Sequence, residues 1–522
     1  MATSETGHDG VLDGDPVARP GRGAVPGAAV GGPVRAAEGG PAPAERLRWG
    51  RLRRPAVLLG VVAAVYAVAQ LTVVSARMGI GWDEAIYASQ FSGHAPPAEF
   101  SAPRAQGMPL LVAPVTALTD SVVVLRLYMT ALSSLGLLAA FWVWTRVRPG
   151  YTAPLAALLF SGCWLSLFYG NEVMPNLYVA LGAVAATGLL CLPVRSRAVV
   201  AGLAGVLAFV SLVRPSDALA LAVPLAGAAV LVRRRRWVQA VAAVVAGLAV
   251  GWGVWLAEAV ARYGGVAARW RAAGEANLTG PAFSVVEHAR ALDGPSLCRW
   301  GTDCGPVSAV ALVWWLAIPL AGAFGLYTAV RERRGPGPLL LAAVVAMVVA
   351  VPYFFYVGYA APRFLMPAYA LAALPAAAGV IALVRWGRSR RRPAAVVFAA
   401  AGLLAHFVLQ GGYAYRMSQI AFEGRERVRL AVEELRRLGV RGPCMVYGQS
   451  GVQFGYLLGC RSQGLAKGFP RRPPVRVRRA LEAGERLLVV HRGARPPRFA
   501  ASWRVVRLPE GWRARFSPSW DD

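Results

Sequence analysis

The chain has 522 residues, of which 56% are hydrophobic and 16% are charged, and its mean hydropathy is +0.46. These values exclude an ordinary soluble globular protein, because such chains carry more charge and fewer apolar residues. The formal net charge of +29 does not indicate nucleic-acid binding, since the arginines cluster in short segments beside apolar runs, where they set membrane topology. We therefore expect a lipid bilayer, and no nucleic acid, among the partners.

The first 45 residues are rich in Gly, Pro and Ala and show no hydrophobic period, so we expect residues 1–45 to form a disordered cytoplasmic tail. The first apolar run begins near Ala56, and five arginines precede it between Arg46 and Arg54. This arrangement predicts an uncleaved signal-anchor with a cytoplasmic N-terminus, and it argues against a cleavable signal peptide.

The next 350 or so residues contain apolar runs of roughly 17 to 25 residues, the length that crosses a bilayer as a helix. We expect about eleven spans, at 56–76, 121–145, 152–170, 174–194, 198–213, 217–232, 238–257, 307–330, 339–357, 364–384 and 394–411. Every second connection is rich in arginine and the alternate short ones hold one arginine or none, so the positive-inside rule places the basic connections in the cytoplasm. The predicted fold is mainly α, a polytopic transmembrane bundle over residues 46–411 with exterior loops 77–120 and 258–306.

Charges return after the last span, where a helical stretch precedes short apolar strands. We expect residues 412–522 to form a small exterior α/β domain. Its turn GQSG, residues 448–451, follows a predicted strand and lacks a full nucleotide fingerprint, so an ordinary strand-to-helix turn is the favoured interpretation. Four of the six cysteines fall in predicted exterior regions, where disulfides persist. We expect Cys298 with Cys304 and Cys444 with Cys460, although four cysteines allow three pairings and zinc is a less favoured alternative.

Two adjacent acids, Asp83 and Glu84, follow the first apolar run in GWDEAIYASQF. The simplest interpretation is that Asp83 caps a helix formed by AIYASQF. Three more ionisable residues are expected at the same membrane face: Glu172 in YGNEVMPN, Arg214 in LVRPSD and Arg363 in GYAAPRFLMPAY. Ionisable groups at membrane depth are costly and usually mark a site. Carboxylates and arginines around one exterior cavity suit a reaction in which a hydroxyl loses its proton while a phosphate leaves.

Some of these residues have structural interpretations as well. Arg214 and Asp217 are expected to form a local ion pair that closes an exterior turn. His94 and His288 have no partner at ligand spacing, so both are expected at the surface. The aromatic residues of the opening motif are expected to form a belt at the headgroup level; they are Trp82, Tyr87 and Phe91.

The chain resembles the GT-C superfamily of integral membrane glycosyltransferases, particularly the bacterial branch similar to protein mannosyltransferases and lipid A aminoarabinose transferases. The resemblance is carried by GWDEAIYASQF, AQGMPLLVAP, LVRPSDALALAVP and PRFLMPAYALAALP, and it covers roughly residues 56–384. It implies transfer of a sugar from a polyprenyl phosphate donor to an acceptor hydroxyl at the extracytoplasmic face, with inversion of the anomeric centre.

The same resemblance implies roles for individual residues. Asp83 would be the general base, while Glu84 would orient the acceptor or hold a cation. Arg363, and with it Arg214, would bind the donor phosphate; an arginine that reaches to lipid headgroups is the alternative for Arg363. Glu172 would bind acceptor or metal, or else cap the fourth span. A requirement for Mg²⁺ or Mn²⁺ is left open.

Two other classes of protein fit parts of the pattern. A multi-pass transporter or flippase also has many helices and charged cavities, although its charges usually lie near the membrane midplane. A non-catalytic scaffold of envelope biogenesis is the third interpretation. The sequence does not identify the sugar or the acceptor, which can be a glycan, a lipid or a protein. Lys467 is the only lysine, which is typical of GC-rich bacterial genomes such as those of actinobacteria.

Overall fold

The computed structural model describes residues 43–192, 196–232, 237–299, 304–465, 468–493 and 495–521, with side chains from Arg54 onward. Residues 1–42, most of the predicted tail, lie outside this range. The chain divides into two units, Met1–Arg48 and Trp49–Asp522. The description that follows concerns the second unit.

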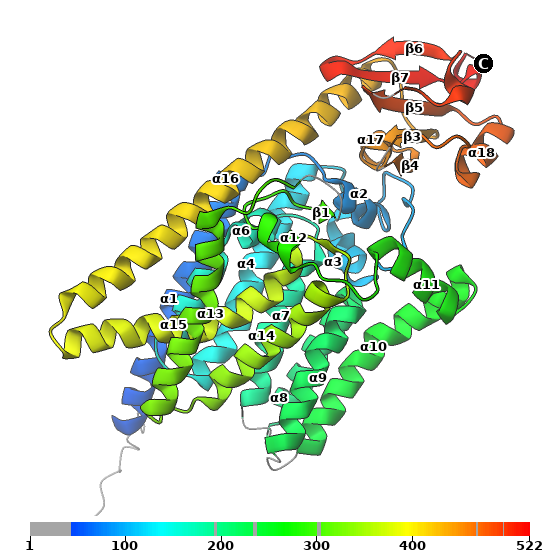
Figure 1. The fold of residues 1–522 in the computed structure, drawn as a ribbon. Coiled ribbons are helices and arrows are strands. Elements are labelled where there is room, and N and C mark those ends of the chain that lie inside the picture. The colour runs from blue at the N-terminus through cyan, green and yellow to red at the C-terminus, as the bar shows by residue number, and fades with distance from the viewer. Residues whose placement is uncertain are drawn as a thin grey trace, which may run out of the picture. The chain divides into compact units, whose positions relative to one another are not determined.

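Helices make up most of this unit (Figure 1). Those that precede the C-terminal domain are α1 (Pro43–Ala69), α2 (Trp82–Ser89), α3 (Gly107–Thr116), α4 (Val122–Val147), α5 (Thr152–Ser161), α6 (Trp164–Gly170), α7 (Pro175–Cys191), α8 (Arg197–Val213), α9 (Pro215–Val232), α10 (Trp237–Tyr263), α11 (Val266–Asn277), α12 (Val285–Arg290), α13 (Ala309–Arg331), α14 (Gly337–Phe355), α15 (Met366–Ser389) and α16 (Pro393–Arg437). A π-helical turn, Gln70–Ser75, continues α1.

The apolar helices confirm a multi-pass membrane protein. Eight described helices are long and apolar enough to span a membrane, and α5 with α6, which are bent by 73° at a short break, make a ninth when they count as one span. The shorter apolar helices α7 and α8 have 17 residues each and coincide with two further predicted spans. The expectation of about eleven spans exceeds the full-length count because 17 residues lie at the lower limit for crossing the hydrocarbon core.

The short helices and the longer connecting segments gather at one end of the spans (Figure 1). They include α2, α3, α11, α12 and a two-residue antiparallel pairing of β1 (Cys298–Arg299) with β2 (Tyr359–Ala360). A disulfide joins Cys298 to Cys304. We call this end the α2 face, and it is the end that the topology prediction places outside the cell.

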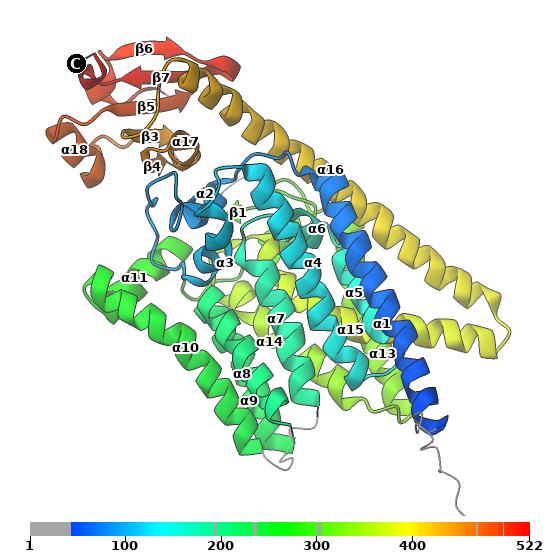
Figure 2. The same cartoon turned by 180° about the vertical axis from the view of Figure 1, so that it is seen from behind.

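Helix α16 has 45 residues and continues beyond the bundle into the C-terminal domain. It passes beside the π-helical turn that ends α1, as Figures 1 and 2 both show. Its last turns carry Val428, Ala431, Val432 and Leu435 at spacings of three and four residues, which places them on one helix face. These side chains pack into the core of the C-terminal domain, so α16 belongs to both parts.

The C-terminal domain is a five-stranded mixed sheet in the order β4-β3-β5-β7-β6. Its elements are β3 (Met445–Gln449), α17 (Gly451–Leu458), β4 (Arg461–Leu465), α18 (Val475–Glu482), β5 (Leu487–Arg492), β6 (Arg504–Arg507) and β7 (Trp512–Phe516). Strand β3 pairs in parallel with β4 and β5, and β7 is antiparallel to β5 and β6. The turn at 448–451 joins β3 to α17, as expected, and a disulfide joins Cys444 to Cys460.

Candidate functional site

The two adjacent acidic residues of helix α2, Asp83 and Glu84, point to different surroundings. The helix begins at Trp82 after Gly81, and the Glu84 carboxylate accepts the Gly81 backbone N–H at 2.7 Å. Glu84 therefore provides the cap that the sequence interpretation gave to Asp83. That interpretation was wrong because the residue at the third helical position reaches back to the N-terminus. Asp83 is left free to point away from the helix.

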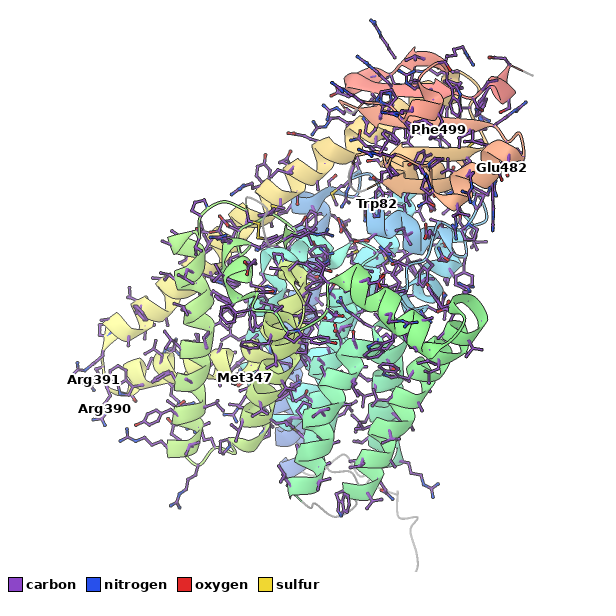
Figure 3. The ribbon with its side chains drawn as sticks, turned by 45° about the vertical axis from the view of Figure 1, so that its right-hand side comes forward. Trp82, Met347, Arg390, Arg391, Glu482 and Phe499 are labelled. Atoms are coloured by element: carbon purple, nitrogen blue, oxygen red, sulfur yellow. A yellow bond between two sulfur atoms is a disulfide. The ribbon has the colours of Figure 1, made fainter. Side chains whose placement is uncertain are left out.

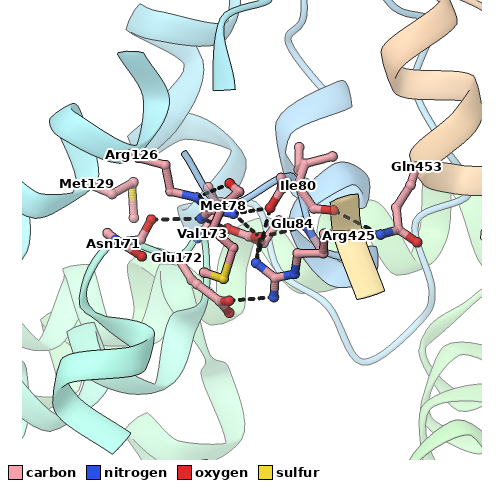
Figure 4. Close-up of polar contacts among 12 residues, drawn as sticks. Met78, Ile80, Glu84, Arg126, Met129, Asn171, Glu172, Val173, Arg425 and Gln453 are labelled. Carbon is pink, nitrogen blue, oxygen red and sulfur yellow. Dashed lines mark hydrogen bonds and ion pairs between the residues drawn. The ribbon is translucent and has the colours of Figure 1, made fainter. Parts of the chain in front are cut away.

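Glu84 lies in a buried cluster with Arg126 of α4, Glu172 and Arg425 of α16, which we call the Glu84 cluster (Figure 4). Arg126 donates to both Glu84 oxygens, one of them at 2.7 Å, and to the Asn171 carbonyl at 2.8 Å. Arg425 donates to Glu84 at 3.2 Å and to Glu172 at 2.5 Å. The cluster thus joins α2, α4, the turn before α7 and α16.

The buried carboxylates of this cluster have shifted pKa values. Burial alone would raise the pKa of Glu84, but Arg126, and after it Arg425, outweigh burial and lower the pKa to about 2. Burial raises the pKa of Glu172, against the attraction of Arg425 and with added repulsion from Glu84. Glu84 is therefore firmly ionised, and its side chain is only 1% exposed. The predicted roles of Glu84 and Glu172 toward an acceptor or a cation stay predictions, and their contacts here are with the protein itself.

Asp83, in contrast, is partly open, with a side chain that is 34% exposed. Arg104 donates to its Oδ1 at 2.5 Å, and Arg363 Nη2 lies 3.8 Å from its Oδ2. Arg363 also lies over the Tyr169 ring, 5.9 Å from its centroid. The structure thus brings together Asp83 and Arg363, which are 280 positions apart in the sequence.

Arg214 lies in the same neighbourhood. It pairs with Asp217 at 3.2 Å, as expected, and it shares the Phe364 ring with Arg363, at 5.0 Å and 5.5 Å from the ring centroid respectively. Tyr353 donates its hydroxyl to Asp217. Burial raises the pKa of Tyr87, and the charges of Arg104, Asp83, Arg214 and Arg363 all act on it. We refer to Asp83, Arg104, Arg214 and Arg363 as the Asp83 cluster.

Three of the arginines in the two clusters were missed in the sequence. Arg126 interrupts the apolar run of α4, and a lone charge within a span is a recognised signal of function or buried pairing. Arg425 stands in a highly charged amphipathic stretch, and Arg104 stands in an irregular loop, where no pattern distinguishes either residue. Buried Arg269 holds the loop of Arg104 by donating to the Ala102 and Arg104 carbonyls at 3.1 and 3.0 Å.

Several side chains differ from their expected surroundings. Tyr87 is buried, so it does not belong to a headgroup belt. The Trp82 ring packs on Gly464 of β4, and Figure 3 shows where Trp82 lies in the molecule. His288 is also buried, against Phe354, and its pKa is lowered to about 4 by burial. His94 packs edge-on against Tyr456 at 4.6 Å and bonds the Ser92 hydroxyl, so neither histidine is a free surface residue.

Metal binding has no obvious donor set in the described part of the chain, where no three His, Cys, Asp or Glu side chains gather. Glu172 pairs with Arg425, and Asp83 pairs with Arg104. We therefore derive no step through a metal ion.

The α2 face thus combines a partly exposed carboxylate and several arginines at one end of an apolar helical bundle. Its fold is the GT-C fold of integral membrane glycosyltransferases. ArnT from Cupriavidus metallidurans, bound to undecaprenyl phosphate, is similar with a TM-score of 0.61 and 15% identity, over 88% of this chain and 98% of that one. The Archaeoglobus fulgidus oligosaccharyltransferase in the apo form has a TM-score of 0.52 and 12% identity, over 83% and 69%.

The likeness to solved structures has no counterpart in the comparisons with family models and curated proteins. No protein-family model matches the chain, and no curated protein matches it. The similarity lies in the arrangement of the helices, at a sequence identity of 15% and 12% to the two structures. The expected GT-C architecture, a mainly α bundle with a small C-terminal α/β domain, is confirmed.

Proposed function

We propose that the protein is a glycosyltransferase that moves a sugar from a polyprenyl phosphate donor to an acceptor hydroxyl at the extracytoplasmic membrane face. The observation that carries this proposal is the position of Asp83 between Arg104 and Arg363. Asp83 can then act as the base for the acceptor, and Arg104 and Arg363, which contact Asp83, can bind the leaving phosphate. The complex of C. metallidurans ArnT with undecaprenyl phosphate supports a lipid phosphate as the donor.

The reaction is a single displacement at the anomeric carbon. The acceptor oxygen forms the new bond to this carbon as the bond to the phosphate oxygen breaks, and Asp83 takes the hydroxyl proton. Polyprenyl phosphate leaves with the electron pair, and Arg363 stabilises its charge because a guanidinium can bond two phosphate oxygens. Attack opposite the leaving group inverts the anomeric centre.

Asp83 and its arginines must exchange partners during this cycle. In the structure Asp83 shares its two oxygens with Arg104 and Arg363, which leaves fewer lone pairs for a proton. A donor phosphate competes for the same guanidinium groups. Donor binding therefore draws the arginines to the phosphate and frees Asp83 to act as the base, so an acceptor alone is not activated.

The test is a turnover assay with the purified full chain in detergent and a panel of polyprenyl phosphate sugars, read as release of polyprenyl phosphate. Asp83→Asn should lower turnover by about 10²–10⁴-fold, the range for loss of a general base, while donor binding persists. Exposed Glu99→Gln, in the same exterior segment, is the matched control and should keep turnover. Consumption of no donor by the wild-type chain, together with movement of lipid-linked sugars across vesicles, would instead establish a transporter.

The proposed orientation places residues 46–411 in the membrane, the N-terminus in the cytoplasm and the domain from residue 412 onward outside. It is supported by the alternation of arginine-rich connections. Protease added to right-side-out vesicles should digest the C-terminal domain, while the same protease should leave it intact in sealed inverted vesicles. The opposite pattern would reverse the orientation.

A further inference from the structure

The C-terminal domain carries an unusual excess of positive charge. From Leu438 to Asp522 the sequence holds sixteen basic and five acidic residues. The two other predicted exterior segments do not share this excess, since residues 77–120 hold two basic and four acidic residues, and residues 258–306 hold five of each. Topology does not account for it, because large domains cross the membrane largely regardless of their charge.

The charge is concentrated around α18. Five arginines fall within nine positions there, and all are exposed; they are Arg471, Arg472, Arg476, Arg478 and Arg479. We call them the α18 arginine face. Among the described residues only Arg478 of these five has an ion-pair partner, Glu482 at 3.8 Å. The face therefore has nearly all of its charge available for a partner.

A cavity of about 540 Å³ lies on the same domain. Its lining combines the domain with the exterior segment that follows α2, and it includes Pro96, Cys444, Gly459, Arg461, Glu485 and Arg486. Arg461 pairs with Glu485, and Arg486 has no ion-pair partner among the described residues. The Arg486 guanidinium lies over the Trp520 ring, 5.6 Å from its centroid. In the described part of the chain, the cavity thus adds a cation without a counter-ion where the domain meets the segment that follows α2.

The domain also contacts the candidate catalytic motif directly. Gln453 of α17 donates to the Ile80 carbonyl at 2.9 Å, and the Trp82 ring rests on Gly464 of β4. The α18 arginine face begins seven residues after Gly464, a stretch that spans at most about 25 Å. A long molecule bound to this face can therefore extend to Asp83.

We propose that the α18 arginine face and the cavity of the same domain bind the acceptor, and that this acceptor is a polyanionic glycan bearing carboxylate or phosphate groups. This inference rests on the proposed glycosyltransferase function and deepens it by naming the class of acceptor. Arginine suits these groups because its guanidinium bonds two of their oxygens at once. A polymer that makes several weak contacts also binds more tightly than each contact alone, because the first contact raises the effective concentration of its other charged groups near the arginines.

An anionic membrane surface is the rival partner, and α18 argues against it. Helices that bind membranes in their plane bury an apolar face among the lipids. The apolar side chains Val477 and Ala480 of α18 are instead buried in the core of the domain. Only Val475, at the start of the helix, is an exposed large apolar residue of α18. Helix α18 thus exposes arginines but no apolar face that could insert into a membrane.

The experiment measures binding of labelled polygalacturonate and poly(glycerol phosphate) to the full chain in zwitterionic nanodiscs, without donor. The test variant replaces the five arginines of the α18 arginine face with glutamine. The matched control replaces five exposed arginines remote from the domain, at Arg331, Arg388, Arg390, Arg391 and Arg392; Figure 3 shows Arg390 and Arg391 at the opposite end of the molecule from Glu482. Dextran of equal length, which carries no charge, serves as the control for glycan binding that does not depend on charge.

We expect the test variant to bind at least one polyanion tenfold or more weakly than wild type, the control variant to stay within twofold, and dextran not to bind. Unchanged melting temperatures would show that both variants are folded. Equal losses in both variants, no polyanion binding by wild type, or binding only to vesicles containing phosphatidylglycerol would each overturn the proposal. Because no donor is present, these outcomes are independent of the turnover assay that tests glycosyl transfer.

Discussion

Two adjacent carboxylates of α2 allow a sharp test of the site, because the same substitution should act differently at each. Glu84→Gln removes a charge that Arg126 and Arg425 share, and it leaves the guanidinium of Arg126 fully buried with its main counter-charge gone. Glu84 also accepts the backbone N–H groups of Gly81 and Val173, at 2.7 and 2.8 Å. Removal of one partner from a buried ion pair costs about 3–5 kcal/mol, so the free energy of unfolding should fall by that amount.

Asp83→Asn is the matched comparison. Asp83 is 34% exposed and its ion pairs are screened by water, so the free energy of unfolding should change by about 0–1 kcal/mol. Thermal denaturation in detergent, followed by tryptophan fluorescence, should lower the melting temperature for Glu84→Gln by several degrees and hardly move it for Asp83→Asn. Turnover, measured below both melting temperatures, should show the larger loss for Asp83→Asn. Equal destabilisation by the two substitutions would refute the division of roles within α2.

Three further outcomes follow from the same contacts. Arg363→Lys should raise the donor KM about tenfold to hundredfold with little change in melting temperature, since it loses one charged hydrogen bond worth about 1.5–3 kcal/mol; an unchanged KM would exclude a phosphate contact. Gly464→Ala should lower turnover without loss of any polar group, because a methyl group there would overlap the Trp82 ring; full activity would show that this packing is dispensable. Since the pKa of Glu84 is lowered to about 2 from 4.5, its stabilisation is complete above pH 4.5 and is lost as the pH falls toward 2. Between pH 4.5 and 2, the free energy of unfolding of the wild type should therefore approach that of Glu84→Gln. A difference in unfolding free energy between the two proteins that does not change with pH would contradict the assigned ionisation of Glu84.

The helical bundle and the C-terminal domain could be predicted from the sequence because both depend on regular patterns of apolar residues. Apolar runs of bilayer length predicted the long helices of the bundle, although α5 and α6 were expected as one span and the short helices α11 and α12 were not predicted. The spacing of Val428, Ala431, Val432 and Leu435 marks the amphipathic end of α16. Arg363 and Asp83 were also singled out correctly as neighbours at one face. Each of them follows an apolar run, so the topology alone brings them to the same end of the bundle.

The partners within the site could not be predicted in the same way. Which arginine pairs with Glu84 depends on the rotation of α4 and α16, and no local pattern encodes that rotation. Arg425 is one of several arginines in FEGRERVRLAVEELRR, and only the structure distinguishes it from Arg429, whose side chain is 44% exposed. The burial of His288 depends likewise on how the loop of α12 folds over Phe354.

The placement of Arg425 on α16 has a consequence for how the chain can be divided. Glu84 and Glu172 belong to the early part of the polypeptide, but Arg425, a cation that pairs with both, follows them by 341 and 253 positions respectively. A fragment that stops at the predicted end of the last crossing, near residue 411, would leave two carboxylates in a dry interior with Arg126 as their only nearby cation among the described residues. The ion pairs inside the membrane portion are therefore completed only after the chain has been synthesised through α16 to Arg425.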